Sequence, residues 1–136
     1  MKIVMNKKQL IDLIKKYEKE EMDFNGRVEI IAKDYHDLQE DYTVVKAVIT
    51  GKLQLLGENY DLTQELNETE IENIIKFYME KAGYRVGKMR FTSTQEYDQR
   101  YRDYNDYHGN TVFDNVEIEV LQNVKKKGDI YDDTFR

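Results

Sequence analysis

Carboxylates are the most abundant side chains in this chain that could do chemistry. The 136 residues include 27 Asp and Glu, and a pair of carboxylates can act as general acid and base or hold Mg²⁺ for hydrolysis. Among so many acids some pair always has a plausible spacing, because separation along the chain does not report proximity in the fold. A small carboxylate-dependent hydrolase or nuclease is therefore one of the function classes that remain open.

Other catalytic and metal-binding signatures are missing from the sequence. The chain has no Cys, and its two histidines, His36 and His108, lack the spacing of a zinc site. It has no Asp-x-Asp-x-Asp-Gly loop for Ca²⁺, no glycine-rich phosphate loop and no Gly-x-Ser-x-Gly elbow. We therefore expect no catalytic, cofactor-binding or metal-binding residue, no cofactor, and a protein that is not an enzyme.

Negative charge is concentrated in the middle of the chain. Residues 34–75 hold ten acids and two bases, a net charge of −8, although the net charge of the whole chain is −6. One interpretation is structural, because carboxylates in the first turn of a helix interact favourably with its dipole and the others would lie in a solvated loop. The alternative is an acidic surface for a basic protein partner, since such a surface speeds encounter and selects the partner.

The alternative interpretation names specific acids as candidate partner-binding residues. They are Asp34, Asp37, Glu40, Asp41, Glu58, Asp61, Glu65, Glu68 and Glu70. If folding gathers them on one exposed patch, their affinity for a basic partner should fall as salt concentration rises. Dispersed carboxylates, or carboxylates paired with lysines and arginines, would argue against this hypothesis.

Residues 95–109 form a second candidate surface, because they carry tyrosines among charged side chains. These partner-binding candidates are Tyr97, Tyr101, Tyr104 and Tyr107. A short third helix at residues 95–108 would align the first three with His108 in one stripe. The stripe would either pack against a sheet or form an exposed recognition surface, since Tyr and Arg are enriched at interface hot spots. We expect no direct nucleic-acid binding here, because acids offset both arginines of the segment.

Two main helices are predicted from apolar stripes with a 3.6-residue period and from end signals. The first spans residues 7–23, where Asn6 and Gln9 can form a capping box. The second starts at a Thr-x-x-Glu capping box, residues 69–72, and ends at Gly83.

Five strands are predicted from alternating or β-branched patterns. They are residues 27–33, 43–50, 52–56, 84–92 and 111–123. Gly51 separates the second from the third, which turns back in a hairpin at residues 57–59, and Gly87 indicates a defect in the fourth.

The resulting order α-β-β-β-α-β-β predicts an α+β fold, an antiparallel sheet of about five strands with two helices packed on it. We detect no internal repeat and no linker, so residues 1–124 are expected to form a single domain and residues 125–136 a polar tail. The lysines at 125–127 would blunt an edge strand. The absence of Cys and of any apolar stretch near 18 residues predicts a complete cytoplasmic protein.

The acidic middle, the Tyr- and Asp-rich segment, the lack of Pro and Cys and the helix-then-sheet order together resemble the small acidic inhibitors encoded by phages and mobile elements. Within that group the chain is most similar to anti-CRISPR proteins that block Cas9. The resemblance covers composition and element order rather than a motif. It implies a non-enzymatic inhibitor in the bacterial host cytoplasm whose acidic surface imitates DNA and competes with nucleic acid for a basic site on a nuclease such as Cas9. The alternative is an accessory or regulatory interaction protein without mimicry.

Overall fold

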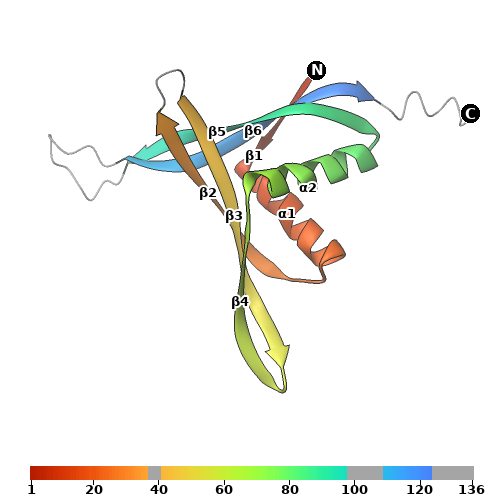
Figure 1. Ribbon diagram of the computed structural model, residues 1–136, viewed down its shortest axis with the longest axis vertical. Helices are drawn as coiled ribbons and strands as arrows, with labels where there is room; N and C mark the ends of the chain where they lie inside the picture. The colour runs from red at the N-terminus through yellow and green to blue at the C-terminus, as the bar shows by residue number, and fades with distance from the viewer. Residues whose placement is uncertain (37–40, 98–108, 124–136) are drawn as a thin grey trace, which may run out of the picture.

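The computed structural model describes residues 1–36, 41–97 and 109–123, which form two helices and six strands. In chain order they are β1 (Lys2–Asn6), α1 (Lys7–Glu21), β2 (Gly26–His36), β3 (Asp41–Leu55), β4 (Glu58–Leu66), α2 (Glu68–Lys81), β5 (Tyr84–Tyr97) and β6 (Gly109–Asn123), as Figure 1 shows. The α+β class and the two helices are confirmed, whereas the number and order of strands differ. Neither described helix has the length and apolarity needed to cross a membrane.

The strands form two antiparallel three-stranded sheets instead of one larger sheet. One has the order β1-β6-β5 and the other β2-β3-β4. In Figure 1 the β5–β6 pair crosses the second sheet, and both helices lie in the angle between the sheets. Buried side chains from both helices and both sheets, including Leu10, Val45, Ile75 and Ile118, belong to one cluster. A single core therefore holds these elements together.

Both helices begin at an asparagine cap with nearly the same backbone geometry. Asn6 has φ −81° and ψ 176°, and Asn67 has φ −80° and ψ 176°. Each asparagine side chain accepts a hydrogen bond from the N–H three residues later, where the side chain of Gln9 or Glu70 accepts one from the asparagine N–H. The first capping box is confirmed. The second starts at Asn67 and not at Thr69, because Asn is the stronger N-cap residue.

The order of elements repeats, although no repeat is evident from the sequence. β1-α1-β2-β3 and β4-α2-β5-β6 are both β-α-β-β units. In each unit the two long strands pair with each other, while the first strand joins the other unit, so that β1 pairs with β6 and β4 with β3. The sheet orders β1-β6-β5 and β4-β3-β2 therefore correspond. The described fold is pseudosymmetric, with exchanged first strands.

Individual side chains also match between the two units. With Asn6 and Asn67 aligned, Ile14 corresponds to Ile75, and Tyr17 to Tyr78. Both isoleucines are fully buried, and the two tyrosine rings contact each other. Equivalent positions therefore meet where the two helices pack.

Two strands are not predicted by the sequence. β1 has only five residues, which is too short for its alternation to stand out. β4 coincides with acidic residues that suggest a solvated loop, but it is an edge strand whose side chains are nearly all exposed. An edge strand with one uncovered face tolerates such a polar sequence.

Other boundaries also differ from the prediction. Gly51 does not interrupt β3, which continues to Leu55 and turns at Leu56 and Gly57. The defect at Gly87 is confirmed by a register shift in β5. Residues 95–97 belong to β5, in place of the third helix. The rest of that segment, residues 98–108, and the tail at 125–136 lie outside the described residues.

Candidate protein-binding surface

The β3–β4 hairpin extends past the rest of the described chain. β2 begins at Gly26, which pairs with Gly51, so β3 loses this neighbour there. β3 and β4 continue as a two-stranded ribbon up to the pair Leu55 and Glu58. In Figure 1 the ribbon projects away from the helices and from the β5–β6 pair. We call residues 52–62 the hairpin arm.

Leu56 and Gly57 form the turn at the tip of the arm. Both have positive φ, 52° for Leu56 and 81° for Gly57, the pattern of a type I′ hairpin turn. Asn, Asp or Gly normally occupies the first position, because a bulky side chain is strained in the left-handed region. Leu56 is nevertheless fully exposed there. The tip therefore presents an apolar side chain at a cost in both backbone strain and hydration.

One face of the arm is apolar and lies on the core side of its sheet. Alternate residues of a strand share a face, so Leu53 and Leu55 lie on the face of β3 that buries Ile49. Tyr60 pairs with Leu53, and Leu62 follows on the same face of β4. Leu53, Leu55, Tyr60 and Leu62 are each 39 to 52% exposed, although they continue a buried face. We call these four side chains the apolar face.

The core ends at Gly51, where the ring of Phe24 closes it. A Cβ on Gly51 would lie 2.5 Å from the Phe24 ring, and one on Gly26 would lie 2.8 Å from it. Glycine at both positions therefore lets the ring approach the strands. The apolar face begins just beyond this ring. A contiguous exposed apolar surface of this kind is typical of an interaction site.

The opposite face of the arm is polar. Lys52 and Asp61 are cross-strand partners and form an ion pair. Gln54 and Asn59 form the next pair on the same face. An exposed ion pair contributes only about 0–1 kcal/mol, so its main effect is to keep this face hydrated. The arm is thus amphipathic.

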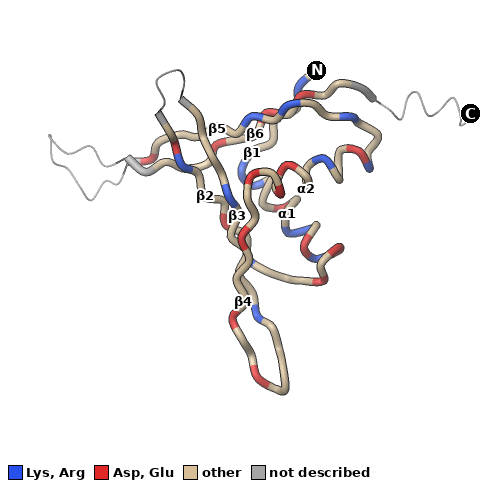
Figure 2. Tube along the Cα trace, in the orientation of Figure 1, with Lys and Arg blue, Asp and Glu red and all other residues tan. Residues whose placement is uncertain are grey.

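The acids nominated from the sequence that the structure describes lie in three places. Asp34 lies near the end of β2, Glu58 and Asp61 lie on the arm, and Glu65, Glu68 and Glu70 lie where β4 meets α2, as Figure 2 shows by the spread of acidic positions. Asp34 pairs with Thr43, and Glu58 with Leu55. At a rise of about 3.3 Å per residue, these two pairs are about 40 Å apart along β3. The described acids therefore do not form one patch.

Asp34 is partly buried and is held by a polar network where the two sheets cross. Its Oδ1 accepts hydrogen bonds from Thr43 Oγ1 at 2.9 Å and Ser93 Oγ at 2.6 Å. Its Oδ2 accepts from Gln95 Nε2 at 3.2 Å and Thr111 Oγ1 at 3.5 Å. These donors come from β3, β5 and β6. The carboxylate therefore ties the two sheets together.

The acids at the junction of β4 and α2 also have partners within the fold. Glu65 forms an ion pair with Lys46 at 3.4 Å, and Glu70 completes the helix cap. Glu68 Oε1 accepts a hydrogen bond from the Val45 N–H at 3.2 Å. Burial raises the pKa of the Glu68 carboxyl, an effect that this hydrogen bond opposes. These acids therefore stabilise the local structure through an ion pair, a helix cap and a hydrogen bond to the backbone, which agrees with the structural interpretation of the charge.

Several nominated residues cannot be placed on a surface. Asp37, Glu40, Tyr101, Tyr104 and Tyr107 lie outside the described residues. Asp41 begins β3 and Tyr97 ends β5, but only their backbone is described. The partner-binding role of these residues stays a prediction.

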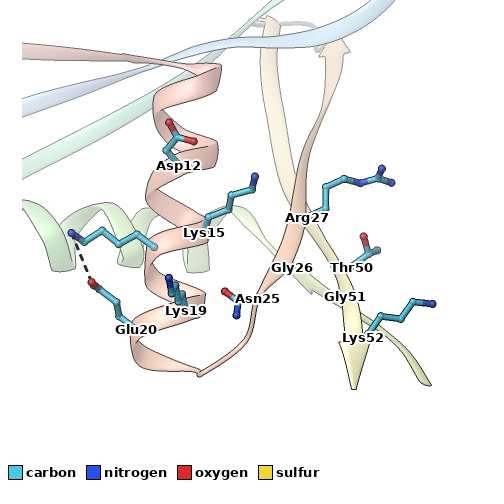
Figure 3. A pocket seen from close by; sticks show the side chains of 11 residues that line it. Asp12, Lys15, Lys19, Glu20, Asn25, Gly26, Arg27, Thr50, Gly51 and Lys52 are labelled. Atoms are coloured by element: carbon cyan, nitrogen blue, oxygen red, sulfur yellow. Dashed lines mark ion pairs between the residues drawn. The ribbon is translucent and has the colours of Figure 1, made fainter. Parts of the chain in front are cut away.

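A basic groove lies at the base of the arm, between α1 and the β2–β3 pair. Its volume is about 790 Å³. Five basic side chains line it, Lys15, Lys16, Lys19, Arg27 and Lys52, against two acids, Asp12 and Glu20. In Figure 3 Lys15 extends from the helix towards β2, whereas the side chains of Arg27 and Lys52 point away from the helix. Lys15 therefore lies on the core side of the sheet, whereas Arg27 and Lys52 extend from the opposite face.

Three cations of the groove remain available to an anionic ligand. Lys16 pairs with Glu20 at 3.9 Å, and Lys52 pairs with Asp61. Within the described part of the chain, Lys15, Lys19 and Arg27 form no ion pair. The groove therefore carries net positive charge in a protein that is acidic overall.

The sequence predicts a strand at residues 52–56 that turns back at 57–59, but sequence reasoning missed the apolar face of the arm and the groove, although each has a signal. Residues 52–62 alternate apolar and polar on both sides of Leu56-Gly57, which is typical of a two-residue hairpin. Lys15 and Lys19 have the i, i+4 spacing that places side chains on one face of a helix. The acidic residues around them in the sequence obscured both patterns.

Among the residues that the structure describes, no group of three or more His, Cys, Asp or Glu side chains is placed to hold a metal ion. Comparison with protein-family models, with curated proteins and with solved structures finds no match to this chain.

Proposed function

We propose that this chain is a non-enzymatic interaction protein that uses the hairpin arm to bind a protein partner. The observation that carries the proposal is the apolar face, which continues the buried face of β3 into solvent. Leu56 at the tip adds to it in a strained conformation. A solvent-exposed arm gains nothing in fold stability from these side chains, whereas a partner surface would bury them.

The charge on β4 supports a partner with a basic site. Glu58, Asp61 and Glu65 lie along this edge strand. Asp61 and Glu65 each form an ion pair with a lysine, so Glu58 is the acid of the arm that is most available to an external cation. In this proposal the apolar side chains anchor the complex and the acids orient it. A nucleic-acid-handling effector such as an RNA-guided nuclease has such a site, and binding there would inhibit it.

The test compares two variants that add the same charge to opposite faces of the arm. Leu55→Asp disrupts the apolar face, and Gln54→Asp alters the polar face. Each variant and the wild type are used to capture proteins from a bacterial lysate, and a captured nuclease is then assayed for cleavage with and without the protein. We expect Leu55→Asp to weaken capture and inhibition at least about tenfold and Gln54→Asp to preserve both. Equal behaviour of the two variants would contradict the proposal.

A second candidate function is an accessory or regulatory interaction protein without nucleic-acid mimicry. The internal partners of Asp34, Glu65 and Glu68 favour it. The two candidates differ in their response to salt. Competition for a basic site predicts affinity that falls steeply between low and physiological salt, whereas anchoring by the apolar face alone predicts little change.

A further inference from the structure

We propose that the hairpin arm also binds a second copy of this chain, with the two arms packed antiparallel through their apolar faces. This inference rests on the arm being a contact surface, as proposed above. We assign a second copy as the partner of this surface because the tip of the arm carries an acid, Glu58, and the groove at the base of the arm is basic. An antiparallel pair of arms would bring these opposite charges together. The resulting dimer would cover the surface that the partner needs.

The first argument is geometric. Packing two arms of equal length face to face and antiparallel brings the tip of each to the base of the other, which is an isologous twofold contact. The apolar side chains of one arm then lie against those of the other, with Leu53 and Tyr60 near the centre. Tyrosine at the centre of an interface is the kind of residue that contributes most to binding.

The second argument is electrostatic. Glu58 pairs with Leu55, so its carboxylate lies at the tip on the same side of the ribbon as the apolar face. Lys15 and Lys19 lie on the helix side of the groove at the base of the arm. An antiparallel contact brings Glu58 of each copy towards Lys15 and Lys19 of the other. Opposite charges therefore meet at both ends of the interface.

The third argument is continuity with the core. The Phe24 ring closes the core at Gly51, and the apolar face starts at the next positions along the strands. The tip of a second arm would rest against this end of the core, where Leu56 would be removed from water. Two β-ribbons joined in this way bury the apolar face as a β-sandwich buries its inner faces.

The main experiment measures the molar mass of the full chain by sedimentation equilibrium over about 1 to 500 µM. We expect the apparent mass to approach twice the monomer value with rising concentration. Leu55→Asp should remain monomeric, whereas Gln54→Asp should associate like the wild type. A wild type that stays monomeric throughout, or a dimer unaffected by Leu55→Asp, overturns the proposal.

A charge exchange tests the orientation of the two arms. Glu58→Lys places like charges at both contacts, and so does the double variant Lys15→Glu, Lys19→Glu, so each alone should associate at least about tenfold more weakly than the wild type. An equimolar mixture restores opposite charges at both contacts and should form a heterodimer. Glu80→Lys, an exposed change on α2, controls for net charge. Failure of the mixture to associate overturns the antiparallel arrangement.

Failure of dimerisation can be distinguished from failure of partner binding. A monomeric protein that still captures its partner through the apolar face contradicts only the dimer. If both proposals hold, capture should decline as the protein concentration exceeds the dimer dissociation constant, because the dimer covers the arm. The double variant Lys15→Glu, Lys19→Glu, which changes no residue of the apolar face and no acid of the arm, should remove that decline.

Discussion

Tyr17 and Tyr78 occupy equivalent positions in the two β-α-β-β units and contact each other edge-on, with ring centroids 6.4 Å apart and an interplanar angle of 85°. Phe77 joins them, with its ring 5.6 Å from that of Tyr17. Edge-on aromatic pairs contribute about 0.5–1.5 kcal/mol beyond the area they bury. The two helices are therefore joined at the pseudosymmetry axis by aromatic rings. One of these residues, Tyr78, also has a raised pKa.

Tyr78 should ionise at a higher pH than an ordinary tyrosine side chain, because its pKa is raised. Burial, followed by the charge of the Glu20 carboxylate, raises its pKa to about 12. Its hydroxyl also donates a hydrogen bond to Glu20 Oε1 at 3.4 Å. An alkaline titration followed by tyrosinate absorbance should show a transition near 12 that is absent in Tyr78→Phe. Because the folded state holds the proton more tightly, this group's contribution to stability is complete below pH 10 and is lost as the pH rises through about 12. Glu20→Gln should lower the transition only partly, since burial is the larger cause.

The comparison of the two units predicts that Glu18→Met stabilises the protein. Glu18 lies on the buried stripe of α1 with 2% exposure, and its equivalent in α2 is Met79, which packs against the core. Within the described residues, Oε1 of Glu18 has no hydrogen-bond partner. We expect urea unfolding to show a gain of about 1–3 kcal/mol at pH 7.

The pH dependence of this gain provides a control. Burial raises the pKa of the Glu18 carboxyl above its ordinary value of 4.5. The folded state therefore holds a proton that the unfolded state releases, and this contribution to stability is lost as the pH rises from 4.5 through the folded pKa. The advantage of Glu18→Met should thus be smaller at pH 4 than at pH 7, and Met79→Glu should destabilise the protein. A gain independent of pH would point to packing alone.

Asp34→Ala should loosen the contact between the sheets. The carboxylate accepts four hydrogen bonds, and its removal takes away the acceptor that Thr43 and Ser93 share, so that only one of these two hydroxyls, 3.1 Å apart, can donate to the other. We expect a loss of about 2 kcal/mol in the free energy of unfolding. Glu96→Ala, an exposed change on β5, should have little effect. An Asp34→Ala protein with unchanged stability but weaker partner capture would instead support a direct role of Asp34 in binding.

Leu56→Asn should separate stability from binding. Asn tolerates the positive φ at this position, so the variant should be more stable by about 1 kcal/mol in thermal or urea unfolding. It also removes an apolar side chain from the tip, and partner capture should weaken. Leu121→Asn removes another exposed leucine, at a bulge of β6 where the residue does not have positive φ, and should therefore bring no gain in stability. If Leu56→Asn binds as tightly as the wild type, the tip does not contact the partner.

Local signals in the sequence predict the helices well because their causes are local. The capping pair Asn6 and Gln9 and the terminal Gly83, with φ 95°, need only neighbouring residues to act. The long strand that ends the described chain is also predicted, since its alternation extends over many residues.

The sheet arrangement and the candidate surface depend on contacts between distant residues. Whether β1 is a strand is decided by its pairing with β6, more than a hundred positions away. Likewise Asp34 looks like a free acid until donors from three other strands surround it. The sequence shows how many carboxylates there are, but not which of them form hydrogen bonds or ion pairs within the fold.

The backbone passes from the first β-α-β-β unit to the second at the tip of the arm, because β4 of the second unit pairs with β3 of the first. Neither unit completes its three-stranded sheet alone, so the halves must fold as one cooperative assembly even though each has its own helix and long hairpin. The connecting turn at Leu56 and Gly57 lies outside the core that both halves share. The tip of the arm can therefore vary among residues that tolerate positive φ, while the architecture that the two halves share stays constant.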